Sequence, residues 1–193
     1  MANNDRNAYP TVKIGNQVWM AANLKTTKYR NGDVIEKVTE KTKWAKLSTG
    51  CYCAYDNNEE NAETYGYLYN WWAVTDSRNI APEGWHVPTD SDWTQLTSYL
   101  GGKSVAGGKL KSTLGWNSPN IGATNESKFS ALPGGYRSSD GNFDSLMYYA
   151  NFWFASESGS TNAWNRSLYF SYADANWDYD NKKCGFSVRL IKD

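Results

Sequence analysis

The chain has 193 residues, with 20 acidic side chains balancing 20 basic ones, and its 10 Trp and 14 Tyr help raise the aromatic share to 16%. This length suits one domain with a substantial buried core. The charge balance argues against a broad basic field, so we expect no nucleic-acid partner. No run of about 18 apolar residues occurs, so we expect no helix that spans a membrane.

The N-terminal end gives no signal of regular structure. We predict a single domain over residues 9–193, preceded by a flexible remnant over residues 1–8. The start of the chain, MANNDRNAYP, lacks the basic and apolar stretches of a signal peptide. The residues therefore leave open a cytoplasmic protein and a protein whose export signal has been removed.

The three cysteines and the single histidine limit the chemistry of the chain. Cys51 and Cys53 are too close in sequence for an ordinary mutual disulfide. A bridge from either one to Cys184 stays open, but we favour three small buried thiols. His86 alone cannot build a histidine-rich zinc site, and no CxxC pair occurs, so we expect no metal and no cofactor. We predict that His86 is buried and hydrogen-bonded to the backbone rather than a general base for a serine.

The first half of the chain predicts a hairpin and two helices. TVKIGNQVWM alternates around a Gly-Asn turn, which predicts a hairpin over residues 11–20. The apolar spacing of NAETYGYLYNWWAVTDS predicts a helix over residues 61–77, with Gly66 weakening its first turn. VPTDSDWTQLTSYLGG predicts a second helix, with Thr89 and Asp92 spaced as a capping box and a glycine stop. Its buried face is expected to hold Trp93, Leu96, Thr97 and Leu100.

The second half predicts a long loop followed by strands. Residues 101–128 are rich in Gly, Ser, Asn and Lys without sustained periodicity, which predicts an ordered surface loop anchored by Trp116 and Ile121. LPGGYR, MYYANFWFASES, NAWNRSLYFSYAD and GFSVRLI then read as strands. The sequence therefore predicts an α+β fold with two helices early and a strand-rich C-terminal half with long loops.

Six motifs carry a family resemblance. TVKIGNQVWMAANL, AETYGYLYNWWAV, GWHVPTDSDWTQL, FSALPGGYR, FWFASES and GFSVRLIKD occur in this order between Tyr9 and Asp193. Together they resemble the Fibrobacter succinogenes major paralogous domain. The resemblance implies a C-type-lectin-like fold related to formylglycine-generating enzymes. It also implies an extracellular or cell-surface location on an exported protein or lipoprotein of gut-type bacteria, with the export signal or anchor removed from this sequence.

The same resemblance implies roles for the last strands. GFSVRLI should return beside the N-terminal hairpin, so that the termini lie close together. LPGGYR should be a central strand in which Gly134 and Gly135 let another backbone or a large aromatic ring approach closely. We expect Arg137 and Arg189 to be ion-paired or hydrogen-bonded scaffold residues rather than ligand contacts.

The sequence gives little support for an enzymatic function. Formylglycine-generating enzymes carry a reactive cysteine pair near the C-terminus, where this chain has Cys184 alone. Asp174, Asp178 and Asp180 lie among aromatics and leave a hydrolase, with Asp174 and Asp178 as its first candidates, as a less favoured alternative. YDNNEEN lacks the glycine and closing glutamate of an EF-hand loop, and Arg166 replaces the aspartate of a lectin calcium motif. We therefore expect no enzyme and no calcium site.

The stretch SESGSTNAWNRSLYFSYADANWDYDNKK predicts a binding face. Its alternation places Trp164, Leu168 and Phe170 inward and Asn165, Ser167, Tyr169 and Ser171 outward. Tyr and Trp give a large contact area at low entropic cost, and small polar residues adapt their hydrogen bonds. The predicted ligand-binding residues are Asn165, Arg166, Tyr169, Tyr172, Asp174, Asn176, Trp177 and Tyr179.

The function that these residues favour is a non-catalytic, surface or secreted binding module that recognises a glycan or a protein. Three alternatives stay open beside it. The aromatics could simply fill the core of a structural or adhesive scaffold domain within a larger surface protein. The segment also resembles the variable region of receptors diversified by retroelements, and the carboxylates leave the hydrolase described above.

Overall fold

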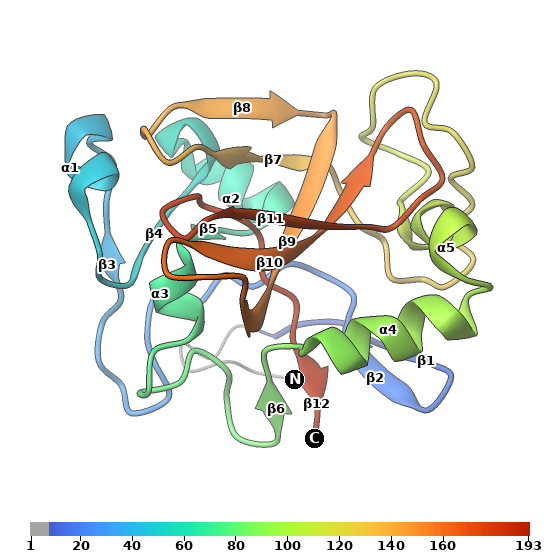
Figure 1. Ribbon diagram of the computed structural model, residues 1–193, viewed down its shortest axis with the longest axis horizontal. Helices are drawn as coiled ribbons and strands as arrows, with labels where there is room; N and C mark the ends of the chain where they lie inside the picture. The colour runs from blue at the N-terminus through green and yellow to red at the C-terminus, as the bar shows by residue number, and fades with distance from the viewer. Residues whose placement is uncertain (1–7) are drawn as a thin grey trace.

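The computed structural model describes residues 8–193 and shows a mixed fold with three sheets and short helices (Figure 1). The predicted flexible remnant lies outside the described residues except for Ala8. The strands are β1 Thr11–Ile14, β2 Gln17–Met20, β3 Glu36–Lys37, β4 Cys51–Cys53, β5 Leu68–Tyr69, β6 Trp85–His86, β7 Gly134–Arg137, β8 Phe143–Leu146, β9 Tyr149–Glu157, β10 Asn162–Tyr169, β11 Asn176–Asn181 and β12 Ile191–Lys192. The helices are α1 Lys41–Lys46, α2 Glu59–Tyr65, α3 Trp71–Val74, α4 Asp90–Tyr99 and α5 Lys103–Leu110, with a 3₁₀ turn η1 at Tyr55–Asn57. The α+β prediction is confirmed.

The end of the chain closes the fold against its beginning. β1 and β2 form the predicted hairpin, and β12 pairs with β2 through Ile191 and Trp19 in the sheet β1-β2-β12-β6. Leu190 O accepts the Met20 amide at 3.0 Å. The C-terminal segment therefore lies beside the N-terminal hairpin, as predicted (Figure 1).

Helix α4 follows its sequence signals. Thr89 Oγ1 accepts the Asp92 amide at 3.3 Å, and Asp92 Oδ2 accepts the Thr89 amide at 2.8 Å, which confirms the capping box. The face carrying Trp93, Leu96 and Thr97 is buried. Local chemistry is therefore sufficient to define where this helix begins and which side it buries.

The prediction of one helix over residues 61–77 is wrong, because Gly66 divides the segment. Gly66 has φ +77°, and a Cβ there would lie 2.6 Å from the Asn23 Cβ. After this glycine the chain runs as β5 against β4, and Asn70 then caps the separate helix α3. A close backbone approach and a sheet pairing thus override the helical spacing.

The predicted loop over residues 101–128 begins instead with helix α5. Two glycines within it conceal the helix from propensity, since glycine costs a helix about 1 kcal/mol relative to alanine. Trp116 is buried and its indole N–H donates to Ala131 O at 2.9 Å, so this anchor is confirmed. Ile121 is 46% exposed, so its prediction as an anchor is wrong.

The five-stranded sheet β11-β10-β9-β7-β8 separates two clusters of buried side chains. On β9, Phe152 and Phe154 pack into the cluster that contains Trp93, while Trp153 packs with Tyr69 in the other. β9 is therefore covered on both faces. This explains why its sequence is an almost continuous apolar run rather than an alternating one.

The glycine pair of β7 has the predicted role. β7 lies between β9 and β8, and a Cβ on Gly135 would lie 2.6 Å from Asp144 O and 2.7 Å from Tyr55 Cε2. A Cβ on Gly134 would lie 3.1 Å from the Tyr65 Cβ. Backbone and aromatic rings therefore approach this strand at distances that leave no room for side chains.

The two predicted scaffold arginines are buried and bonded mainly to carbonyl oxygens. Arg137 donates to Val38 O at 2.6 Å, Thr39 O at 2.9 Å and Gly141 O at 3.0 Å, and it stacks on Trp44 at 4.4 Å. Arg189 likewise donates to backbone carbonyl oxygens and to the side-chain oxygen of Asn23. Their role as hydrogen-bonded scaffold is confirmed.

Cys51, Cys53 and Cys184 are free and buried, as favoured from the sequence. Burial raises the pKa of the Cys53 and Cys184 thiols to about 12. These thiols stay protonated at neutral pH and behave as small core side chains.

The prediction for His86 is wrong. Its side chain is 38% exposed and lies between two carboxylates, with Nδ1 2.6 Å from Asp193 Oδ1 and Nε2 3.3 Å from Asp92 Oδ2. The reason is the pairing of His86 with Ile191, which brings the last residue of the chain next to the imidazole. His86 therefore links the N-terminus of α4 to the C-terminal strand.

Candidate ligand-binding site

The predicted site residues lie on the two-stranded ribbon β10–β11 and on the turn that joins its strands. In the antiparallel register Arg166 faces Trp177 and Trp164 faces Tyr179, whereas Asn165 faces Asp178. Because successive side chains of a strand point to opposite sides, the ribbon has two surfaces. We call them the tryptophan side, with Trp164, Trp177 and Tyr179, and the tyrosine side, with Tyr169 and its neighbours.

A cleft of about 380 Å³ opens on the tryptophan side and is lined by Asp90, Ser156, Trp164 and Trp177. Trp177 is 36% exposed, and its indole N–H donates to Asp90 Oδ1 at 2.5 Å. Trp164 packs edge-on against Tyr179 at 5.5 Å. Two indoles, a carboxylate and a hydroxyl therefore converge on one hollow beside the start of α4.

Arg166 lies beneath this cleft rather than in it. The side chain is fully buried, with its guanidinium 3.7 Å from the Trp177 ring centroid and 5.5 Å from that of Trp93. Nη1 donates to Ala175 O at 3.3 Å, and burial lowers the pKa of Arg166 to about 10. The predicted ligand contact by Arg166 is therefore corrected: it supports Trp177 from below.

Asn165 is also fully buried, so its predicted outward orientation is wrong. Its Nδ2 donates to Asp180 Oδ2 at 2.9 Å. On the neighbouring strand β9, its register partner is the buried Trp153. Strict alternation fails as a guide to exposure here because both faces of the central sheet are covered at this point. Ser167 is buried for the same reason.

The tyrosine side carries a chain of rings. Tyr169 lies 4.3 Å from Tyr149 and 5.6 Å from Tyr172, measured between ring centroids, and Tyr172 is 57% exposed. A groove of about 440 Å³ runs alongside, lined among others by Tyr55, Phe143, Asp144, Tyr148, Tyr149 and Tyr169. Sequence reasoning found Tyr169 and Tyr172 but missed the groove, because β8 supplies its other wall.

The remaining predicted residues are spread over both surfaces. Asp174 and Asn176 are half-buried, and Tyr179 is 55% exposed. Asp178 is exposed and lies near Asp180, whose pKa is raised by burial and by the Asp178 charge. The acid with the raised pKa is thus Asp180, one of the three aspartates named for the hydrolase alternative.

Sequence reasoning missed Asp90 and Ser156 as cleft residues. Asp90 stands at the start of α4, where an acidic residue has an ordinary role in helix stability. Ser156 lies near the end of β9, opposite an irregularity in the register of β10 between Ala163 and Asn165. Only the tertiary arrangement brings these two side chains to the indoles.

Lys111 supports the tyrosine side from the interior. The side chain is fully buried, and Nζ donates to Ile121 O at 2.9 Å, Tyr169 O at 3.0 Å and Tyr172 O at 2.9 Å. Burial lowers the pKa of Lys111 from 10.5 to about 8. Because two of these carbonyls, of Tyr169 and Tyr172, lie at the turn between β10 and β11, Lys111 holds this turn in place.

We expect Lys111→Met to lower the free energy of unfolding by about 2 kcal/mol at neutral pH, because three carbonyls lose a donor. Since the folded pKa of Lys111 is about 8 and the unfolded value is 10.5, the unfolded chain binds more protons between these limits. The contribution of this lysine to stability therefore rises with pH across that window. Urea unfolding of both proteins at several pH values checks this; a wild-type advantage that stays constant or shrinks would contradict it.

The fold and this surface define a sheet-rich α+β domain that presents aromatic side chains on both sides of one ribbon. No helix of the described residues is long and apolar enough to cross a membrane. The chain belongs to the Fibrobacter succinogenes major domain family, whose model matches residues 12–192. No curated protein and no solved structure matches the chain.

Proposed function

We propose that the protein is a non-catalytic binding module that recognises a glycan through the cleft on the tryptophan side. The observation that carries this proposal is the pair of indoles, Trp164 and Trp177, at a hollow whose polar groups are Asp90 and Ser156. A sugar ring needs a flat apolar surface for its C–H face and a few fixed polar groups for its hydroxyls. The cleft offers both, and its volume of about 380 Å³ lies within the usual range for small-ligand sites.

Rigidity supports the same assignment. Trp177 is held from below by Arg166 and at its edge by Asp90, so its ring has little freedom left to lose when a ligand binds. Preorganised aromatic rings with adaptable small polar neighbours are typical of recognition surfaces. A protein ligand would use the same rings, and the binding test below separates the two classes.

We expect Trp177→Ala to reduce glycan binding roughly tenfold or more, a loss of about 1.4 kcal/mol, because the stacking surface disappears. The loss of stability should be only about 1 kcal/mol, since the ring is partly exposed and the contact it loses with the Arg166 guanidinium is a cation–π contact. A glycan array followed by calorimetric titration of the best sugar measures the first effect, and thermal unfolding measures the second.

Tyr99→Ala is the matched control, because Tyr99 is 65% exposed on α4 and does not line the cleft. This variant should bind like the wild type. Binding of Trp177→Ala at wild-type affinity would contradict the proposal, as would an array that captures no glycan. A Trp177→Ala protein that fails to fold would instead show that the ring serves packing.

We further propose that the arrangement is C-type-lectin-like and that the module works at the cell surface or after secretion. The pairing of β12 with the N-terminal hairpin supports the fold, because it brings the two ends of the domain together as that fold requires. The location follows the family resemblance of the motifs. Protease treatment of intact cells that express the full-length gene product checks the location, since a surface-exposed protein is degraded while cytoplasmic proteins survive.

A further inference from the structure

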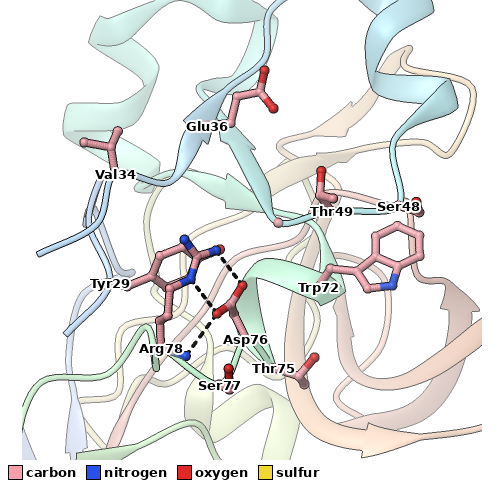
Figure 2. Close-up of a pocket in the computed structure, with 11 residues that line it drawn as sticks. Tyr29, Val34, Glu36, Ser48, Thr49, Trp72, Thr75, Asp76, Ser77 and Arg78 are labelled. Carbon is pink, nitrogen blue, oxygen red and sulfur yellow. Dashed lines mark hydrogen bonds and ion pairs between the residues drawn. The ribbon is translucent and has the colours of Figure 1, made fainter. Parts of the chain in front are cut away.

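A second cavity, of about 490 Å³, opens beside α3 and shares no residue with the tryptophan cleft (Figure 2). We call it the α3 cavity, and the residues used below are Tyr29, Glu36, Ser48, Thr49, Trp72, Asp76 and Arg78. In Figure 2, Tyr29 and Arg78 lie together on one side of Asp76, and Trp72 lies on the other. Segments from three separate parts of the chain thus meet around one hollow.

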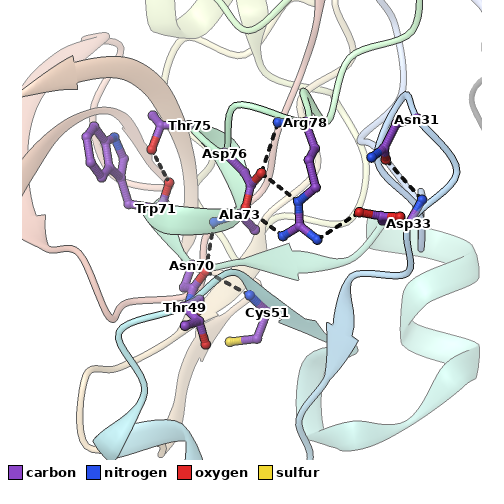
Figure 3. Close-up of polar contacts among 10 residues, drawn as sticks. All are labelled: Asn31, Asp33, Thr49, Cys51, Asn70, Trp71, Ala73, Thr75, Asp76 and Arg78. Atoms are coloured by element: carbon purple, nitrogen blue, oxygen red, sulfur yellow. Dashed lines mark hydrogen bonds and ion pairs between the residues drawn. The ribbon is translucent and has the colours of Figure 1, made fainter.

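One wall of the α3 cavity is an ordered ion pair. Asp76 accepts from Arg78 Nε and Nη2, both at 2.8 Å, and from the Arg78 amide at 3.0 Å (Figure 3). Arg78 Nη1 reaches Asp33 Oδ2 at 3.2 Å, and the guanidinium lies 4.1 Å from the Tyr29 ring centroid. The hydrogen bonds from Arg78 lower the pKa of Asp76 to about 2, so this group is a fixed carboxylate at neutral pH.

On the opposite wall of the cavity, the side chain of Asn70 holds the backbone in place through three hydrogen bonds. Asn70 Oδ1 accepts the Ala73 amide at 3.1 Å and the Cys51 amide at 3.0 Å, and Nδ2 donates to Thr49 O at 2.7 Å (Figure 3). This side chain ties the start of α3 to the segment before β4. Thr49 and the half-buried Trp72 are therefore held on a rigid frame.

The charged groups of the α3 cavity already have partners. Arg78 is shared between Asp76 and Asp33, and Glu36 pairs with Lys43 at 2.5 Å. A cationic ligand would have to compete with the resident cations, and an anionic ligand would meet the two carboxylates that line the cavity, Glu36 and Asp76. Hydrogen-bonding capacity nevertheless remains, because each carboxylate oxygen accepts more than one bond.

We propose that the α3 cavity binds a neutral, polyhydroxylated ligand, the sugar ring of an oligosaccharide, with Trp72 against the apolar ring face. Asp76 accepts hydrogen bonds from ring hydroxyls, and the exposed side chains of Ser48 and Thr49 complete the polar rim. The cavity volume lies within the usual range for ligand sites. With the cleft occupied as well, the domain has two sugar sites, which raises its affinity for long or clustered chains through avidity.

The test maps binding site by site with nitrogen-labelled protein in NMR titrations. The probes are glucose, galactose, mannose, N-acetylglucosamine and a set of neutral disaccharides, with glucosamine and galacturonate as charged comparisons. The Trp72 and Trp177 indole signals are assigned from Trp→Phe variants. We expect at least one neutral probe to shift the Trp72 indole signal, and to do so equally in wild type and in Trp177→Ala.

Thr49→Arg is the blocking variant, because this exposed residue lies at the cavity rim and a long side chain there fills the opening. It should weaken the Trp72 response roughly tenfold or more, while Thr113→Arg, an exposed site on another segment, leaves it unchanged. Asp76→Asn should also weaken it. Shifts confined to Trp177, shifts caused by charged probes alone, or an unaltered response in Thr49→Arg would each overturn the proposal. The proposals for the α3 cavity and for the tryptophan cleft can therefore be contradicted independently of each other.

Discussion

Arg189→Met should lower the free energy of unfolding by about 4 kcal/mol. The guanidinium is fully buried and donates to Asn23 Oδ1 at 2.7 Å, to Ser130 O at 3.0 Å, to Met20 O at 3.3 Å and to Phe129 O. Bonds to a charged donor contribute about 1.5–3 kcal/mol each, and buried acceptors left without a donor add desolvation cost. Methionine restores volume but none of the donors.

Guanidinium chloride unfolding of the two proteins measures this loss. Arg30→Met is the matched control, because Arg30 also donates to three carbonyls but lies at the surface, where water can replace it. We expect Arg30→Met to cost less than half as much. Equal losses in the two variants would show that the burial of Arg189 is not what makes it important.

Gly107→Ala should destabilise the protein by about 3 kcal/mol, although helix propensity alone predicts a gain of about 1 kcal/mol. A Cβ at Gly107 would lie 2.0 Å from Asp174 O and 2.7 Å from Ala173 O. The backbone of α5 is also bonded to this turn, with the Gly108 amide donating to Ala173 O at 2.9 Å. Neither backbone can move away without breaking this bond.

The same substitution should disturb the turn between β10 and β11, and with it Tyr172 on the tyrosine side. Ser104→Ala is the control, since Ser104 is exposed on the same helix and the change should raise stability by only a few tenths of a kcal/mol. Denaturant unfolding compares the two. A Gly107→Ala protein as stable as Ser104→Ala would mean that α5 does not pack directly on the turn.

Elements with complete local signals could be predicted from the sequence. The hairpin β1–β2 has its turn glycine between alternating strands, and α4 has its cap, its apolar face and its stop within one short segment. The scaffold roles of Arg137 and Arg189 were also expected. In each case the residues that decide the structure are adjacent in sequence, or the chemistry of the buried group admits few partners.

The sequence predictions that were wrong share one physical cause. A backbone or side chain that is distant in sequence determines the local conformation or the burial in each case, namely at Gly66, helix α5, His86 and Asn165. The α3 cavity could not be predicted for the same reason, because its walls come from segments around Tyr29, Thr49 and Asp76. Candidate sites assembled this way give no motif, since no single stretch carries more than part of the chemistry.

The register of the β10–β11 ribbon has a consequence for how such a domain can diversify. Even-numbered positions of β10 and odd-numbered positions of β11 point to one surface, and the complementary positions point to the other. A point change at an exposed position of this hairpin therefore alters one surface chemically and leaves the other intact. The chemistry of the two surfaces can therefore change independently within the twenty contiguous codons of residues 162–181, without any rearrangement of the scaffold.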